Sequence, residues 1–383
     1  MQTGHNQDSF SCVNLISTGQ YVTPNKVLTD DIVQCIKSRL SDELLASISK
    51  LGVTARHSVI DNYCDYLAGH CDRKLISSTT LMAVNAVRDC FERMPATSKQ
   101  IGMIMTITNT ANRPLPCFGY EVIGALEGDI PHDVNVINMQ NQGCAAQIKA
   151  FDIASDYLKL HPNKLALLVV SEAHTAFADQ LIRDKYYGLR ELVKIKDKNE
   201  FAATQHLIEI CLFGDGATAF LLSADQDGQF KIGPFTHLTN IDPADSDLLT
   251  MNEGGALTPV YSGFPAYVMN RNVPARGTVY ASKCVDDLFN KFSLSLSAPD
   301  KADHYLIHTG SKLILDKLCD TINVKRDDER VKISYSILEK YGNLSSCSIA
   351  FMLHDSFQKK ITGKSLLISF GVGFSSSVCI AES

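Results

Sequence analysis

Three residues of this chain could together form a nucleophilic site: Cys144, His308 and Asn343. Cys144 stands in the sequence Gln142-Gly-Cys-Ala-Ala146, between a short predicted strand and an apolar helix expected over about residues 144–160. A thiol at a helix N-terminus lies beside free backbone N–H groups and the positive end of the helix dipole, and both favour the thiolate. A single such cysteine is nevertheless more often an inert buried residue, so the case depends on its partners.

His308 and Asn343 are predicted at equivalent edges of the fold. His308 ends a predicted strand over residues 304–308, and such a residue projects from the carboxyl edge of a parallel sheet, where α/β proteins bind ligands. Asn343 opens a predicted helix over about residues 344–359 and could be its N-cap, although Ser345 could also take that role. Each residue alone has a structural explanation. Together they predict a nucleophile supported by an imidazole and an amide.

The elements that carry these residues form an internal repeat. In the first half, a strand at 101–108, a helix near 120–126, a strand at 134–139, the Cys144 helix and a strand at 165–170 follow in order. The second half repeats this order up to a strand at 365–369. The alternation predicts a layered α/β fold with two related halves, residues 1–204 and 205–383, and with the chemistry between them.

The composition of the chain disfavours several classes of protein. The chain has 383 residues, 45% of them hydrophobic, and a formal net charge of −6, which does not favour a nucleic-acid surface. No apolar run is long enough to span a bilayer, and no signal peptide is predicted. The twelve cysteines form no C-x-x-C pair, and no metal site is predicted. A reduced, cytoplasmic setting is expected.

Two segments extend the basic repeat. Residues 240–278 are rich in glycine and proline and are predicted to form a long ordered loop or lid. The other segment, residues 181–200, holds the densest basic cluster of the chain. Its six members are Arg183, Lys185, Arg190, Lys194, Lys196 and Lys198.

Five ordered motifs resemble the thiolase superfamily, and most closely the β-ketoacyl-acyl carrier protein synthase III branch, with similarity to chalcone-synthase-like type III polyketide synthases. They cover nearly the whole chain: Ser17-Thr-Gly-Gln-Tyr-Val-Thr-Pro24, Leu51-Gly-Val-Thr-Ala-Arg56, Phe213-Gly-Asp-Gly-Ala217, Tyr341-Gly-Asn-Leu-Ser-Ser346 and Phe370-Gly-Val-Gly-Phe374. The resemblance implies a duplicated, five-layered αβαβα fold. Gly214 and Gly216 are expected to serve packing and turns.

The resemblance also implies the chemistry. Cys144 would take an acyl group from acyl-CoA or a phosphopantetheine-linked thioester, and a malonyl- or β-ketoacyl-type thioester would then condense with it, in specialised polyketide or fatty-acid-derived metabolism. His308 and Asn343 would stabilise the enolate, and the backbone N–H groups of Cys144 and Val372 would form an oxyanion hole. No permanently bound cofactor is implied. The partners would be acyl carrier protein, docked on the basic cluster, and a second copy paired through the strand around residues 165–171.

Departures from the family leave alternatives open. The Thr-Gly after His308 matches neither the "HQAN" of the synthase III branch nor the "HPGG" of the polyketide branch. Residues 370–375 hold no cysteine, which disfavours a degradative thiolase, and no glutamate follows the strand near residue 110, which disfavours a hydroxymethylglutaryl-CoA synthase. Acyl transfer to a hydroxyl or amine, without decarboxylation, stays possible. So does a non-catalytic partner subunit of a heteromeric ketosynthase.

Overall fold

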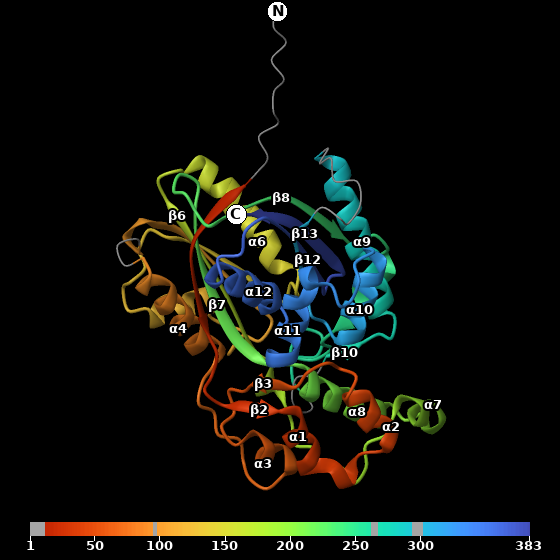
Figure 1. The fold of residues 1–383 in the computed structure, drawn as a ribbon. Coiled ribbons are helices and arrows are strands. Elements are labelled where there is room, and N and C mark those ends of the chain that lie inside the picture. The colour runs from red at the N-terminus through yellow and green to blue at the C-terminus, as the bar shows by residue number, and fades with distance from the viewer. Residues whose placement is uncertain (1–11, 95–97, 262–266, 293–301) are drawn as a thin grey trace, which may run out of the picture.

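The computed structural model describes residues 12–94, 98–261, 267–292 and 302–383. Nine strands form the main sheet: β1 (Val13–Tyr21), β4 (Ile101–Thr108), β5 (Asn135–Gln140), β6 (Leu165–Ala173), β7 (Asp215–Ser223), β8 (Phe230–Thr239), β11 (His304–Ile307), β12 (Lys364–Gly371) and β13 (Ser375–Glu382). Their order is β11-β12-β13-β8-β1-β7-β6-β4-β5, and β1 joins the two halves because it pairs with both β7 and β8 (Figure 1). Four short strands form two separate pairs: β2 (Lys26–Leu28) with β3 (Ala55–His57), and β9 (Leu249–Thr250) with β10 (Val268–Met269).

Helices cover the outer faces of the sheet and fill the layer between its two halves. They are α1 (Thr29–Ile36), α2 (Asp42–Ile48), α3 (Tyr63–Ala68), α4 (Thr79–Glu92), α5 (Phe118–Ala125), α6 (Ala146–Leu160), α7 (Leu189–Ile195), α8 (Lys198–Leu212), α9 (Val273–Lys291), α10 (Lys312–Thr321), α11 (Lys332–Tyr341) and α12 (Cys347–Gln358). In Figure 1, α6 and α12 lie at the centre, α4 lies on one flank and α9 and α10 on the other.

Alternating side chains divide the core into layers. In β6, Leu165, Leu167 and Val169 join the cluster that includes α4 and α5, whereas the residues between them join α6 and α12. In β12, Leu366 and Ile368 face α9 and α10 instead. The resulting sequence of layers is helix, sheet, helix, sheet, helix, so the expected five-layered thiolase fold is confirmed. Because β6 is covered on both faces, its first six residues, 165–170, are all apolar.

The order of elements also confirms the repeat. The first half runs β4, α5, β5, α6, β6, with β4 parallel to β5 and β6, and the second half contains β11, α10, α11, α12 and β12, with β11 parallel to β12. The division at residue 204 remains a prediction. Residue 204 lies within α8, and β7, which follows it, pairs with β6 of the first half.

The sequence-based prediction of the dimer strand is wrong. Residues 165–171 belong to β6, which pairs with β4 along one edge and with β7 along the other. No backbone edge of β6 is left for a second copy. The end of the sheet on this side is β5, which pairs with β4 alone among the described strands.

Candidate active site

Cys144 lies in a tight turn between β5 and α6. The helix begins at Ala146 rather than at Cys144, so the thiol stands two residues before the first helical residue. Gly143 has a φ of +67°, and a Cβ there would lie 2.5 Å from the backbone nitrogen of Val372, so this position requires glycine. The N–H of Gly143 donates to Oδ1 of Asn109 at 3.0 Å, which ties the turn to the end of β4.

The state of the thiol differs from the sequence-based expectation of a thiolate. Burial raises the pKa of Cys144 above its ordinary value, and the nearby negative charge of Glu172 acts in the same direction. The hydroxyl of Ser345, 3.6 Å from Sγ, opposes this rise. The resting thiol is therefore protonated, and a base must accept its proton before it can attack a carbonyl.

His308 supplies a neutral imidazole in the same cavity. It directly follows β11, and its backbone N–H donates to the carbonyl of Ile368 at 2.8 Å, which fixes it beside β12. The ring meets Phe370 edge-on, with centroids 5.7 Å apart. Burial lowers its pKa to about 3, and Nδ1 has no hydrogen-bond partner within the described part of the chain. A neutral imidazole can accept a proton or donate a hydrogen bond.

Asn343 is held by both ends of its amide. Its Nδ2 donates to the carbonyl of Gly310 at 3.2 Å, and its Oδ1 accepts from the N–H of Ser345 at 2.8 Å. One N–H of the amide group is therefore left over, because Nδ2 carries two hydrogens. The N-cap interpretation is wrong: α12 begins at Cys347, and Ser346 occupies the cap position.

Two backbone turns meet beside the thiol. A Cβ on Gly371 would lie 2.6 Å from the backbone nitrogen of Cys144, so the loop between β12 and β13 is in close contact with the Cys144 turn. The hydroxyl of Ser369 donates to the carbonyl of Cys144 at 2.6 Å and fixes this contact. The N–H groups of Cys144 and Val372 thus lie on neighbouring turns, and their role as an oxyanion hole stays a prediction.

The three predicted side chains and Val372 line one cavity of about 370 Å³. Part of its wall comes from the segment at 240–278, through β9, β10 and residues next to them; residues 262–266 of that segment lie outside the described part. Other walls are apolar or aromatic. They include Phe213, Phe370 and Phe374, and the 240–278 segment adds Met251, Tyr267 and Met269.

Sequence reasoning missed Glu172 and its neighbours. This fully buried carboxylate, at the end of β6, accepts hydrogen bonds from both N–H groups of Asn109, at 3.0 and 2.7 Å, and from the hydroxyls of Thr110 and Ser346. Burial raises its pKa, and these donors oppose the rise. Glu172 therefore holds the residues that follow β4 and the residue that precedes α12 close together beside the cavity. The sequence did offer one indication of Glu172, namely a charged residue near the end of an otherwise apolar predicted strand.

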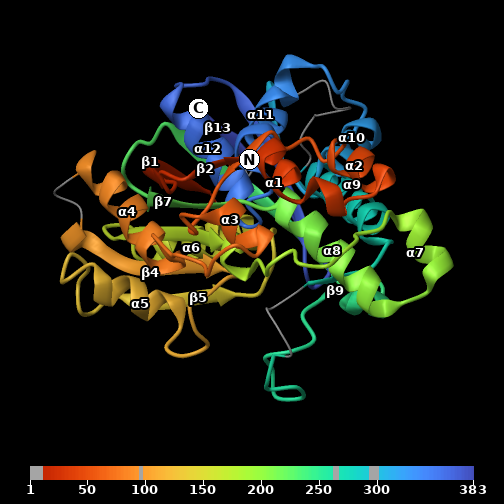
Figure 2. The same ribbon diagram turned by 90° about the horizontal axis from the view of Figure 1, so that it is seen from below.

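The basic cluster lies away from the catalytic cavity. It spans the loop before α7, α7 itself and the start of α8, and α7 projects at one edge of the molecule (Figure 2). Arg183 pairs with Glu200 at 2.6 Å, and Lys185 lies 3.8 Å from Glu191. Arg183 also lines a neighbouring cavity of about 480 Å³ that shares Met251 with the catalytic one.

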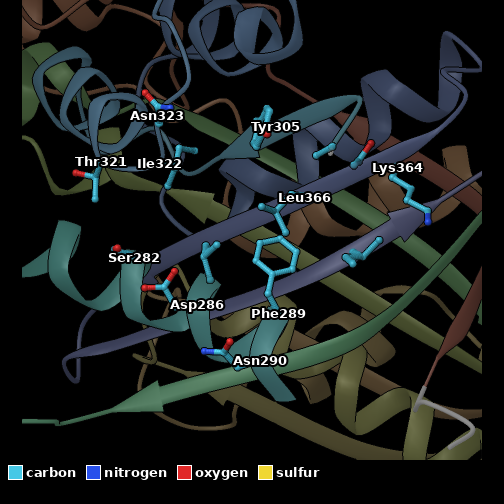
Figure 3. A pocket seen from close by; sticks show the side chains of 14 residues that line it. Ser282, Asp286, Phe289, Asn290, Tyr305, Thr321, Ile322, Asn323, Lys364 and Leu366 are labelled. Atoms are coloured by element: carbon cyan, nitrogen blue, oxygen red, sulfur yellow. The ribbon is translucent and has the colours of Figure 1, made fainter. Parts of the chain in front are cut away.

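A further cavity, of about 420 Å³, lies between α9, α10 and strands β11–β13 (Figure 3). Its walls include Asp286, Tyr305 and Lys364 and none of the predicted site residues. Within the described residues, no group of three or more His, Cys, Asp or Glu could hold a metal ion. No helix among those residues could cross a membrane.

The family motifs have structural roles that explain their composition. A Cβ on Gly214 would lie 2.1 Å from the carbonyl oxygen of Tyr341, and one on Gly216 would lie 2.4 Å from Phe351. Both glycines therefore permit close packing, as expected. Asp215 between them accepts from the N–H groups of Val59 and Thr175, at 2.7 and 2.8 Å.

Two family models match the chain on either side of this cavity. The FAE1/type III polyketide synthase-like model matches residues 42–190, which include Cys144, and the 3-oxoacyl-[acyl-carrier-protein] synthase III C-terminal model matches residues 296–382, which include His308 and Asn343. In these two regions the chain is similar to FAE1/type III polyketide synthase-like proteins and to synthase III.

The named relatives of this synthase III-like chain are distant. The α-pyrone synthesis polyketide synthase-like Pks18 of Mycobacterium tuberculosis is 23% identical over 304 residues, which cover 76% of this chain and 66% of that protein, just under two thirds of it. A β-ketoacyl-[acyl-carrier-protein] synthase III of Natranaerobius thermophilus is 21% identical over 395 residues, 97% of this chain and 99% of that protein. The C-terminal type III polyketide synthase domain of Steely1 from Dictyostelium has the same fold, with a TM-score of 0.77 at 16% identity, covering 97% of this chain and 99% of that domain.

Proposed function

We propose that this synthase III-like chain loads an acyl group onto Cys144 and condenses it, with loss of CO₂, with a malonyl- or β-ketoacyl-type thioester. The observation that carries the proposal is the single cavity lined by Cys144, His308, Asn343 and the two backbone turns. The donors are acyl-CoA or a phosphopantetheine-linked thioester. The chain's own side chains supply the other groups that the reaction needs, so no permanently bound cofactor is proposed.

In the loading step, the neutral His308 accepts the proton of the Cys144 thiol as sulfur attacks the donor carbonyl. The oxyanion that forms is held by the N–H groups of Cys144 and Val372. The bond from the acyl carbon to the donor sulfur then breaks, and the departing thiolate takes the proton from His308. The products are an acyl thioester on Cys144 and a free donor thiol.

In the condensing step, a malonyl-type extender loses its carboxylate as CO₂, and the electron pair of the broken bond forms an enolate. His308 and the spare N–H of Asn343 donate hydrogen bonds to its oxygen. The enolate carbon attacks the acyl carbon on Cys144, a C–C bond forms, and the bond to Cys144 sulfur breaks. The product is a β-ketoacyl thioester, and the Cys144 thiolate that leaves takes up a proton from solvent, which restores the resting thiol.

The partners are part of the same proposal. A homodimer would form through β5, the end strand of the sheet on the side of the first half, because its outer backbone groups are available for pairing in the described structure. Sedimentation at micromolar protein concentration would check this, and a monomer would contradict it. Acyl carrier protein would dock on the basic cluster around α7, whose exposed Lys194, Lys196 and Lys198 could meet an acidic helix.

The experiment separates the two half-reactions. Intact-protein mass spectrometry after incubation with acetyl-, hexanoyl- and lauroyl-CoA should find one acyl adduct, and Cys144→Ser should lack it. His308→Ala or Asn343→Ala should lower release of CO₂ from malonyl-CoA by about 10²–10³-fold, and should lower loading much less in the Asn343 variant. An adduct on another cysteine would overturn the site. Loading without CO₂ release would favour transfer to a hydroxyl or amine, and an absence of loading would favour a non-catalytic subunit.

A further inference from the structure

A second imidazole, His174, faces the same cavity and has no part in these steps. It begins the short 3₁₀ turn that follows β6, and its side chain is 3% exposed. The ring stacks on Phe213, with centroids 4.4 Å apart and planes inclined by 19°. Both residues line the catalytic cavity. The stacking fixes the plane of the imidazole and therefore the directions in which its two nitrogens point.

Each nitrogen of His174 faces a polar group. The hydroxyl of Tyr267 lies 3.5 Å from Nδ1, and Oε2 of Glu172 lies 3.7 Å from Nε2. Nε2 has no hydrogen-bond partner within the described residues. Because the facing carboxylate attracts a proton on Nε2, the neutral ring carries its hydrogen there and leaves Nδ1 to accept from Tyr267.

Carboxylate, imidazole and hydroxyl are therefore in line, in the order Glu172, His174, Tyr267. Burial lowers the pKa of His174 to about 3, and the carboxylate 3.7 Å away opposes this by stabilising the imidazolium that forms when the ring accepts the phenolic proton. Distances slightly longer than ordinary hydrogen bonds are typical of acid–base groups before substrate binds. Tyr267 comes from the segment next to β10 and, like His174, lines the cavity.

Another carboxylate, imidazole and hydroxyl series lacks this access. His237 lies 3.1 Å from Asp152 and 2.9 Å from Ser377. Ser377 is completely buried within β13, so no substrate can reach its hydroxyl. That series joins α6 to β8 and β13, which is a structural role.

We propose that Tyr267, backed by His174 and Glu172, is a second acid–base centre that enolises the β-ketoacyl thioester inside the catalytic cavity. This inference rests on the proposed function, since such a thioester is the product of condensation. The proton between two carbonyl groups is far more acidic than an ordinary C–H, so a modest base suffices. The enolate would feed a reaction that consumes it, namely a further C–C or C–O bond formation at the same site.

The step balances without any further reactant. The C2–H bond of the β-ketoacyl thioester breaks, and its proton passes to the Tyr267 oxygen as the phenolic proton moves to Nδ1 of His174. The electron pair forms the enolate, whose thioester oxygen is held by His308 and Asn343. Return of a proton along the same path restores the ketone. In D₂O, repeated cycles would replace the C2 hydrogens with deuterium.

The test is exchange at C2 of acetoacetyl-CoA, followed by NMR in D₂O at a pD where the uncatalysed exchange is slow. A Cys144→Ala background removes acyl transfer, so the outcome is independent of whether Cys144 is ever loaded. The background protein should accelerate exchange, and an added Tyr267→Phe, which keeps the ring, should lower this acceleration by about 10²-fold. The matched control is Tyr261→Phe, an exposed tyrosine of the same segment, which should leave exchange unchanged.

His174 is tested as a positioning residue. His174→Ala should lower exchange to a similar extent, and added imidazole should restore part of it, which a purely structural role would not allow. His174→Gln, which keeps the space filled, serves if the alanine protein melts early. No acceleration by the background protein, or exchange within about twofold of it in Tyr267→Phe, would overturn the inference. Failure to load Cys144 would overturn the proposed function alone.

Discussion

Replacing Gly371 with alanine tests whether the two backbone turns form the oxyanion hole. The backbone of Gly371 lies outside the positive-φ region, so alanine is acceptable for conformation. Its methyl group would lie 2.6 Å from the nitrogen of Cys144, and ordinary contact begins at 3.4 Å. The turns would have to separate by about the difference, 3.4 − 2.6 = 0.8 Å. A shift of this size moves both N–H groups away from the developing oxyanion.

We expect loading of Cys144 to slow by roughly 10²-fold, since a misplacement near 1 Å or the loss of one donor has an effect of this order. The unfolding free energy should fall by only about 1–3 kcal/mol, the usual cost of overpacking. Rates come from release of free CoA with acetyl-CoA as donor, and stability from urea unfolding. The matched control is Gly124→Ala in α5, where an added Cβ meets nothing within 4 Å. A Gly371→Ala protein that loads within threefold of the parent would refute the proposed oxyanion site.

Two other predictions concern charge. The triple change of Lys194, Lys196 and Lys198 to Glu should raise the apparent KM for a donor bound to a carrier protein, because charges at the rim of an interface act mainly on association. It should scarcely alter turnover of the same acyl group on a pantetheine mimic. Equal effects on both donors would contradict this docking site. His308 has a pKa near 3 when folded and about 6.5 when unfolded, so the unfolded state binds the proton first and stability is lost as pH falls below about 6.5. Between pH 7.5 and pH 5 the free energy of unfolding of the parent should fall by about 2 kcal/mol through His308 alone. In urea unfolding, His308→Gln should therefore gain about this much stability relative to the parent over the same pH range. A relative change under about 0.5 kcal/mol would contradict a buried neutral ring.

Long apolar runs explain what the sequence predicted well. β4 has the bounds expected from its pattern, and β6 begins at the expected Leu165, because a strand covered on both faces is apolar at most of its positions. The same apolar pattern does not indicate which strand lies at the end of the sheet. The sequence of a strand that is buried on both faces is apolar whether the strand lies in the middle of the sheet or at its end. β5, with polar Asn135, Asn138 and Gln140, is instead mostly half-buried. Which strand ends the sheet is decided by tertiary pairing, not by local pattern.

The candidate site divides in a similar way. Cys144, His308 and Asn343 could be predicted because each belongs to a local motif and an ordered repeat. The group around His174 could not, since Tyr267 lies 93 positions further along the chain in an irregular segment. The protonation of Cys144 could not be predicted from the sequence either, because it results from burial, which only the fold determines.

The position of β1 between the two halves has a consequence for synthesis of the chain. Thr18 pairs with Phe220 in β7, and Val13 with Ile232 in β8, so both neighbours of β1 follow it by about 200 residues. At about 5–20 residues per second, the ribosome supplies them roughly 10–40 s after β1. During that interval β1 has two unpaired backbone edges, which other chains could join. Its polar Asn14, Ser17 and Gln20 make such pairing less favourable, and the first half cannot complete its sheet until the second has begun to emerge.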